Sequence, residues 1–265
     1  MKRREFLASS LAASAASGLA YGEPAGAQGG GAAAAQARDF YELRYYHLHR
    51  STAKLANDYL RDAAIPALNR IGIRPVGVFN VLVGPESPSL YMLIPHPSAE
   101  SVLTAWERVR ADREYRERGA EFLNAPASSP AYVRVEIELM AAFRTHPHIT
   151  PPPEGPRVFE LRTYENPTKN ANLTKIEMFN SGEIDIFKRV GFHPVFFGEK
   201  LIGQRWPNLT YMLASASVEE RDKHWAAFGA DPEWKKLSSI PKFTDERIIC
   251  NITNYLLRPA PYSQV

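Results

Sequence analysis

The sequence is nearly free of cysteine and lacks the short motifs that mark several large enzyme classes. Cys250 is the only cysteine among 265 residues, so no disulfide can form within the chain. There is no glycine-rich dinucleotide or Walker loop, no Gly-x-Ser-x-Gly elbow and no Cys-x-x-Cys pair. These absences argue against nucleotide-binding enzymes, α/β-hydrolases and disulfide redox enzymes.

The chain also has little net charge and no long hydrophobic run. Its 32 basic and 29 acidic residues are interspersed and give a net charge of +3, and the one dense basic cluster lies at the extreme N-terminus. Nucleic-acid binding needs a concentrated basic face, so nucleic acid is not expected as a partner. No stable membrane span is expected, because the N-terminal apolar run is short and rich in alanine and serine.

Residues 1–27 are predicted to form a signal peptide. Basic residues at 2–4 precede a weakly apolar run, and the small residues at 25–27 have the spacing of a signal-peptidase site. The paired Arg3 and Arg4 resemble a twin-arginine export signal, which predicts a periplasmic or secreted protein. An ordinary secretion signal and a disordered basic tail are the alternatives.

The remainder of the chain is predicted to be a tandem duplication. Three stretches recur in the same order in both halves: Tyr41-Glu42-Leu43-Arg44 and Phe159-Glu160-Leu161-Arg162, Tyr91-Met92-Leu93 and Tyr211-Met212-Leu213, and Trp106 with Asp112 and Trp225 with Asp231. Matches that keep their order over so long a stretch are improbable by chance. We therefore predict two related units, a first unit at residues 39–144 and a second unit at residues 157–260.

Two segments outside these units are predicted to lack helices and strands. Residues 28–38 are rich in glycine and alanine and are predicted to be a flexible lead-in. Residues 145–156 are rich in proline and are predicted to be a stiff, extended linker. His146 and His148 lie in this linker, where solvent-exposed linker residues are expected rather than ligands.

Each unit has the pattern of a strand, a helix, two strands, a second helix and a last strand. Residues 40–48 alternate in polarity as a strand does, Gly72 is expected to end the first helix, and Pro66 is expected to bend it. The second helix is predicted to break at Asp112 and at Asp231. This βαββαβ order predicts an α+β fold of two tandem ferredoxin-like units. Each sheet would have helices on one face only, so the bare faces should stack into a dimeric α+β barrel-type arrangement within one chain.

With these motifs the sequence resembles the NIPSNAP family. The resemblance rests on Glu42-Leu43-Arg44 with Tyr46, on Glu160-Leu161-Arg162 with Tyr164, and on the segments Trp106…Asp112-Arg113-Glu114-Tyr115 and Trp225…Asp231-Pro232-Glu233-Trp234. It covers both units and implies membership of the dimeric α+β barrel superfamily, which includes small monooxygenases and haem-handling enzymes. It does not imply a particular chemistry.

Charged residues within the predicted strands define the candidate site. If Leu43 and Leu161 pack under the helices, the interior between the sheets receives six polar side chains: Glu42, Arg44, Tyr46, Glu160, Arg162 and Tyr164. Buried charges must be paired or must bind something charged. The hypothesis is a pocket for a small-molecule ligand in which Arg44 and Arg162 hold an anionic group. The alternative is that each Glu-Arg pair has a purely structural role.

Histidines are weaker candidates. His47 and His49 could share a strand face and hold a metal, but no third ligand is close in sequence, so no metal is expected. His193 or His224 could be a haem ligand or a general base, although surface and packing roles are commoner. No cofactor is expected.

Two functions remain open at this point. The first is an exported barrel that binds a small, partly apolar or anionic molecule in its interior. The second is a monooxygenase-like or isomerase-like enzyme acting on a small organic substrate, which would need a titratable group within reach of that substrate. A homo-oligomer is expected, because the strand edges left by two fused units invite pairing.

Overall fold

The computed structural model describes residues 37–84 and 86–265. The predicted signal peptide and most of the predicted lead-in, residues 28–36, lie outside the described residues. The last lead-in residue, Arg38, donates from Nη1 to the carbonyl oxygen of Ala142 at 3.0 Å, so the described chain is attached to the sheet at its start. In the described part of the chain, every helix is too short or too polar to cross a membrane.

The first unit contains four strands and two interrupted helical segments. Its elements are β1 (Phe40–His47), α1 (Ala53–Tyr59), the π-helical turn η1 (Leu60–Ala64), α2 (Ile65–Arg70), β2 (Gly77–Val83), β3 (Ser89–His96), α3 (Ala99–Ala111), α4 (Arg113–Arg118), α5 (Ala120–Leu123) and β4 (Arg134–Ala142).

The second unit repeats this order and adds short helices before its last strand. Its elements are β5 (Val158–Glu165), α6 (Lys169–Met178), the π-helical turn η2 (Phe179–Glu183), α7 (Ile184–Arg189), β6 (His193–Ile202), β7 (Asn208–Ser215), α8 (Val218–Ala230), α9 (Pro232–Ser238), the 3₁₀ turn η3 (Pro241–Phe243), α10 (Asp245–Ile248) and β8 (Asn251–Pro259).

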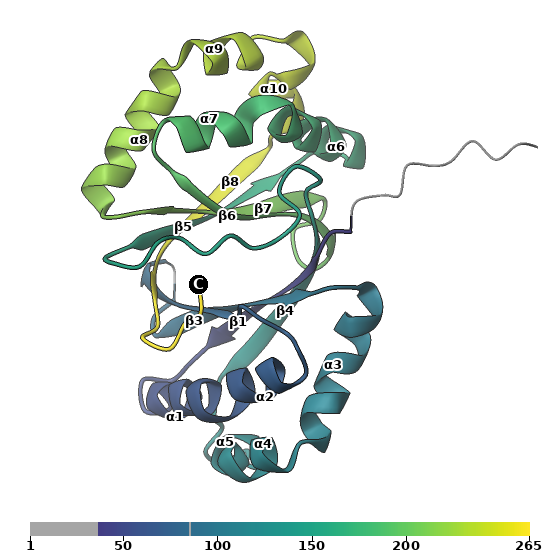
Figure 1. Cartoon of the computed structure of the whole chain (residues 1–265), viewed down its shortest axis with the longest axis vertical. Coiled ribbons are helices and arrows are strands. Elements are labelled where there is room, and N and C mark those ends of the chain that lie inside the picture. The colour runs from purple at the N-terminus through teal and green to yellow at the C-terminus, as the bar shows by residue number, and fades with distance from the viewer. Residues whose placement is uncertain (1–36, 85) are drawn as a thin grey trace, which may run out of the picture. The chain divides into compact units, whose positions relative to one another are not determined.

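The eight strands close into one antiparallel barrel in the order β1-β3-β2-β8-β5-β7-β6-β4 (Figure 1). Within each unit the first strand lies between the third and the fourth, as in a ferredoxin-like sheet. The units join twice, where β2 pairs with β8 and β4 pairs with β6. This confirms the predicted fold class: two tandem ferredoxin-like units form a dimeric α+β barrel-type arrangement within one chain.

Closure of the barrel removes the reason for which an oligomer was expected. Each of the strands in residues 37–84 and 86–265 has a neighbour on both sides, so none of them has an edge free to pair with another chain. A homo-oligomer stays a prediction, and edge pairing is not a basis for it.

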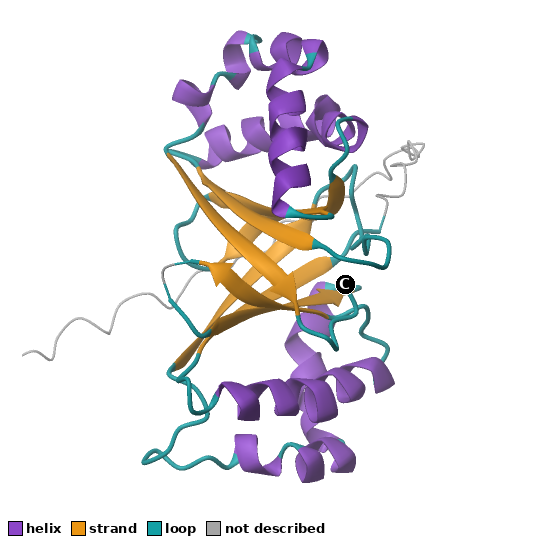
Figure 2. Ribbon diagram, turned by 90° about the vertical axis from the view of Figure 1, so that its left-hand side faces the viewer, coloured by secondary structure: helices purple, strands orange, loops and turns teal. Residues whose placement is uncertain are grey.

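The helices pack on the outer side of the barrel, those of each unit over its own strands (Figure 2). The outer core of the first unit contains Met92, and that of the second contains Tyr211, each packed under the helices of its own unit. The interior core draws on both units and contains Leu43 and Leu161. The barrel therefore buries the inner and the outer faces of its strands alike.

The second helix of each unit breaks where the sequence predicts. The carboxylate of Asp112 accepts a hydrogen bond from the backbone N–H of Tyr115 at 3.2 Å and begins α4. The carboxylate of Asp231 accepts from the backbone N–H of Trp234 at 3.0 Å and begins α9. Both aspartates act as N-caps, since a side-chain oxygen satisfies a free N–H at a helix start.

The first helix of each unit is interrupted by a π-helical turn. In the first unit the turn at 60–64 directly precedes Pro66, the residue expected to bend this helix, whereas the turn at 179–183 contains Gly182 with a φ of 150°. The predicted helix end at Gly72 is confirmed, because this residue has a φ of 87°, which favours glycine.

The predicted linker at 145–156 packs against the barrel. Ile149 is buried in the interior core. His146, expected to be exposed, is buried instead, and its Nε2 lies 3.2 Å from the carbonyl oxygen of Val195. That expectation was wrong because the segment returns along β6 rather than crossing solvent. His148 is exposed, as expected, and lies next to Asp39.

The C-terminal tail also enters the barrel, as Figure 1 shows. The backbone N–H of Gln264 donates to the carbonyl of Val76, which fixes the tail beside β2. Val265 is buried in the interior core. The tail and the linker together fill space that the strands alone would leave open.

Candidate ligand-binding site

The structure places the predicted site residues on the outer side of the barrel, under the helices, not in its interior. This holds for all six of them: Glu42, Arg44, Tyr46, Glu160, Arg162 and Tyr164. Leu43 and Leu161 face the interior instead. The predicted interior location is therefore wrong. Alternation shows which residues share a strand face, but both faces of these strands are buried, so polarity does not reveal which face lies under the helices.

Glu42 joins β1 to α3 in the first unit. It accepts from Arg44 Nε at 2.5 Å and from Trp106 Nε1 at 3.0 Å, and His96 Nε2 lies 3.2 Å from it. The guanidinium carbon of Arg44 lies 3.9 Å from the centroid of the Trp106 ring, a cation–π contact. The Glu-Arg pair is thus direct, as the structural alternative predicted.

Glu160 has the same place in the second unit and more donors. It accepts from Arg162 at 2.8 Å, from Arg221 at 2.6 and 2.7 Å, from Trp225 at 2.7 Å and from Asn254 at 2.5 Å. Its side chain is 2 % exposed. The repeated Glu-Leu-Arg motif therefore ties the second helix of each unit to the first strand of that unit.

These hydrogen bonds keep both glutamates ionised. Burial alone would raise the pKa of Glu160, but the hydrogen bond from Arg221 and the charge of Arg162 hold that pKa below its usual value. Burial would likewise raise the pKa of Glu42, and the hydrogen bond from His96 with the charge of Arg44 lowers it below its usual value. Neither residue is suited to act as a general acid at neutral pH.

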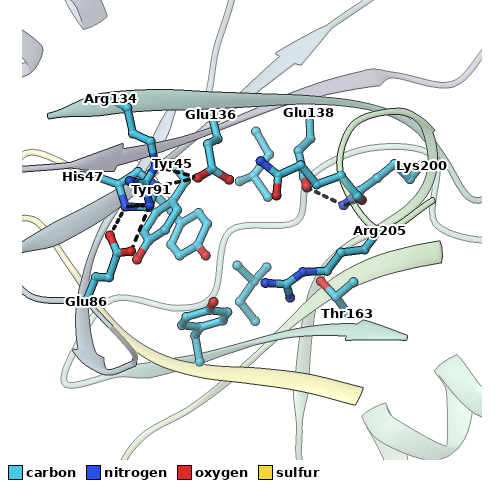
Figure 3. Close-up of a pocket in the computed structure, with 14 residues that line it drawn as sticks. Tyr45, His47, Glu86, Tyr91, Arg134, Glu136, Glu138, Thr163, Lys200 and Arg205 are labelled. Atoms are coloured by element: carbon cyan, nitrogen blue, oxygen red, sulfur yellow. Dashed lines mark hydrogen bonds and ion pairs between the residues drawn. The ribbon is translucent and has the colours of Figure 1, made fainter. Parts of the chain in front are cut away.

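A cavity of about 250 Å³ lies inside the barrel, on the opposite face of the same strands (Figure 3). The rings of Tyr45 and Tyr91 stack with centroids 4.4 Å apart, and Tyr255 from the second unit meets Tyr91 at 5.6 Å. Burial raises the pKa of Tyr45 and of Tyr91, so both remain neutral phenols. One wall is thus aromatic and carries hydroxyl groups.

The other side of the cavity carries two cations from the second unit. Lys200 is buried, and its Nζ lies 2.6 Å from a carboxylate oxygen of Glu138. Burial lowers the pKa of Lys200, although Glu138 opposes this shift. Arg205 donates to the hydroxyl of Thr253 at 2.9 Å, and within the described residues no carboxylate lies at ion-pair distance from it. Its φ of 58° is rare outside glycine and marks a constrained turn.

The acidic residues at the cavity mouth are already paired. His47 contacts Glu86 through Nδ1 and Glu136 through Nε2, the latter at 2.8 Å. Arg134 donates to Glu86 at 2.9 Å and to Glu136 at 3.0 Å. Figure 3 shows this cluster at one side of the cavity, away from Lys200 and Arg205. Its acids are therefore not available to neutralise Arg205.

The histidines proposed as metal ligands or as catalytic groups are placed elsewhere. His49 lies beyond the end of β1 and is exposed, so it does not join His47 at the cavity. In residues 37–84 and 86–265, no group of three or more His, Cys, Asp or Glu side chains could hold a metal ion. His193 lies next to the carbonyl of Thr150 and His224 next to the hydroxyl of Ser215, and neither lines the cavity.

Some of the residues that line the cavity could have been predicted from the sequence. Strand alternation places Tyr45 and His47 on the face of β1 opposite Arg44, so choosing that face as the interior identifies them. No local sequence pattern identifies Lys200 or Arg205 as lining residues. Lys200 lies near the end of β6 and Arg205 in the turn that follows, and this part of the chain comes next to β4 only because the barrel closes.

Solved structures with similar folds include several α+β barrels. A candidate monooxygenase of Lactobacillus acidophilus NCFM has 9% sequence identity and a TM-score of 0.57, over 84% of this chain and 94% of that chain. A candidate monooxygenase of Fusobacterium nucleatum has 7% identity and a TM-score of 0.56, over 84% and 93%. A NIPSNAP family protein of Agrobacterium tumefaciens strain C58 has 23% identity and a TM-score of 0.34, over 41% and 91%. At such low identities, the two matches with TM-scores above 0.5 show the fold alone.

No significant match is found among curated proteins. The model of the NIPSNAP family, in contrast, matches residues 41–127 and 159–264, which together make up more than half of the sequence. The two matched segments contain the two repeats of the Glu-Leu-Arg motif and most of the strand residues of the barrel, while β4 lies between them. The chain therefore belongs to the NIPSNAP family.

Proposed function

We propose that this NIPSNAP protein binds a small, partly apolar anion in the barrel cavity, and that single-ring aromatic carboxylates are the ligand class. The observation that carries the proposal is the pairing of an aromatic wall with a cation that has no acidic partner among the described residues. Tyr45, Tyr91 and Tyr255 form the wall, and Arg205 points toward it from the opposite side (Figure 3).

The cavity volume suits a ligand of this size. A space of about 250 Å³ exceeds the roughly 150 Å³ of a cavity that accepts benzene. A ring would pack against Tyr45 and Tyr91, since aromatic pairs favour offset or edge contacts. Its carboxylate would accept hydrogen bonds from Arg205, whose planar guanidinium matches carboxylate geometry.

Replacing Arg205 by alanine tests this proposal. We expect isothermal titration calorimetry to show that benzoate or phenylacetate binds the wild type and binds Arg205→Ala about 10- to 100-fold more weakly, because a hydrogen bond to a charged group is lost. Benzamide, which has no charge, should bind both forms weakly and alike. Arg258→Ala is the matched control, since Arg258 is exposed on β8 and does not line the cavity.

The binding proposal fails if neither carboxylate binds the wild type at millimolar concentration. It also fails if Arg205→Ala and Arg258→Ala bind benzoate equally well. Thermal melting of both variants shows whether the fold is intact. We expect both to be folded, because both arginines are exposed.

We also propose that the protein is exported to the periplasm or secreted. The support is the sequence of residues 1–27, in which Arg3 and Arg4 precede an apolar run and a small-residue cleavage site. In a bacterium with a twin-arginine exporter, the wild type should occur in the periplasmic fraction and a variant with Arg3→Lys and Arg4→Lys in the cytoplasm. Lys2→Gln leaves the arginine pair intact and is the control. Equal export of all three forms contradicts the twin-arginine signal.

A further inference from the structure

A groove lies outside the barrel in the first unit, between the outer faces of β1 and β4 and the helices α3, α4 and α5. Its volume is about 800 Å³. The lining includes Phe122 and three apolar or aromatic residues that remain partly open to solvent: Leu123 at 42%, Tyr132 at 39% and Ile137 at 51% exposed. The groove is thus larger than the barrel cavity and more apolar.

The charges that line the groove are all positive. Among the described residues, Arg44, Arg110 and Arg116 belong to the lining, and no Asp or Glu does. Arg116 is held in place by hydrogen bonds from Nη1 to the carbonyls of Arg110 and Ala111, at 2.9 and 2.8 Å. A lining of this composition favours an anion with an apolar body.

Arg44 presents its guanidinium differently from its counterpart in the second unit. Arg44 donates to Glu42 through Nε, and its guanidinium stacks on Trp106 in the groove lining. Arg162 instead donates to Glu160 through Nη1 and to the hydroxyl of Tyr164 through Nη2. Arg44 therefore bonds Glu42 through Nε whereas Arg162 bonds Glu160 through Nη1, and each guanidinium also has a tyrosine of its own strand as a partner, Tyr46 for Arg44 and Tyr164 for Arg162.

The same place in the second unit is filled. Ile137 lies opposite Arg44 in the sheet, and Asn254 lies opposite Arg162 and donates to Glu160. A cluster of Met178, Phe243 and Ile248 packs under the short helices before β8. The open groove is thus a property of the first unit and does not follow from the shared fold.

A buried ion pair contributes to this difference. Lys175 and Glu183 pair beneath the helices of the second unit at 3.0 Å, and Lys175 also contacts the rings of Tyr164 and Trp234. When residues 60–64 are aligned with residues 179–183, Ala56 corresponds to Lys175 and Ala64 corresponds to Glu183. Beside these smaller side chains, Tyr59 stacks on Phe122 with ring centroids 4.0 Å apart. The two stacked rings form the floor of the groove.

We propose that this groove is a second ligand site, distinct from the barrel cavity, for an amphipathic alkyl carboxylate. Its carboxylate would lie between Arg44 and Arg110, and its alkyl chain along Phe122 and Ile137. The charge of the lining selects an anion, and its volume admits a chain longer than a single ring. The site is independent of the proposed function, because the two linings have no residue in common within the described part of the chain.

Calorimetric titration with dodecanoate tests the site, with dodecan-1-ol as the uncharged probe of equal chain length. We expect dodecanoate to bind the wild type and dodecan-1-ol to bind at least tenfold more weakly. Arg110→Ala should weaken dodecanoate binding about tenfold, because a charged hydrogen bond is lost. Arg113→Ala is the control, since Arg113 is exposed next to the same helix and does not line the groove.

A blocking variant addresses the apolar part of the groove. Ile137→Trp should abolish dodecanoate binding by filling the groove, and Ile252→Trp on the outer face of β8 should not. Both positions are partly exposed, so thermal melting should show folded proteins. Arg205→Ala, which alters the barrel cavity, should leave dodecanoate binding unchanged.

Several outcomes would overturn this proposal. Equal binding of dodecanoate and dodecan-1-ol would mean that the arginines do not select an anion. Equal effects of Ile137→Trp and Ile252→Trp would mean that the groove is not the site. Absence of dodecanoate binding to the wild type would mean that the groove does not bind an alkyl carboxylate. If sedimentation shows that Ile137→Trp converts a dimer to a monomer, this face instead contacts a second copy of the chain.

Discussion

Replacing Glu160 by alanine should lower the free energy of unfolding by about 3–5 kcal/mol, because it leaves buried partners without their acceptor. Arg162 and Arg221 both donate to this carboxylate, and Arg162 lies largely out of solvent beneath the helices. Urea unfolding at pH 7, followed by circular dichroism, measures the loss. Glu154→Ala in the exposed part of the linker is the control and should change stability by less than about 0.5 kcal/mol. A loss below 1 kcal/mol for Glu160→Ala would contradict the structural role.

The same carboxylates should set the acid limit of stability. Folding lowers the pKa of both Glu42 and Glu160 from the ordinary value of 4.5, so each contributes stability above that value. This contribution is lost as the pH falls through the lower pKa of the folded state. The free energy of unfolding of the wild type should therefore fall steeply below pH 4.5, and Glu160→Ala should show a shallower fall.

Replacing Lys175 by methionine alone should destabilise the fold by about 3–5 kcal/mol, whereas adding Glu183→Leu should restore most of that loss. Lys175 and Glu183 are each 1% exposed, and burial raises the pKa of Glu183 despite the charge of Lys175. Removing one partner leaves a buried group whose ionised form is costly. Removing both replaces the pair with apolar side chains, which the first unit already has as Ala56 and Ala64.

A double-mutant cycle in urea measures this coupling. The exposed pair of Lys188 and Asp185, at 3.2 Å, is the matched control, and its removal should change stability by less than about 1 kcal/mol. If the losses of Lys175→Met and Glu183→Leu simply add in the double variant, the two residues do not act as a pair. The interpretation of Lys175 and Glu183 as a coupled buried ion pair would then be wrong.

The order of elements in each unit could be predicted from the sequence, because local patterns determine it. The repeat, the strand alternation of residues 40–48 and the caps at Asp112 and Asp231 all depend on residues near one another in the chain. From these patterns follow the two ferredoxin-like units and, since each sheet has one bare face, the stacking of the two sheets, but not the closure of their edges into one barrel.

Local sequence patterns do not determine which side chains line the barrel cavity. The sequence correctly placed Arg44 on one strand face and Tyr45 on the other, but only the tertiary structure decided that Tyr45 faces the interior. Both faces of β1 are buried, one by helices and one by the opposite sheet, so polarity gives no preference between them. Lys200 and Arg205 reach the cavity through pairing of β4 with β6, a contact between units that no local pattern specifies. The sequence by itself determined the elements and their repetition, and the closure of the barrel decided which side chains share a cavity, because that depends on contacts between residues far apart in the chain.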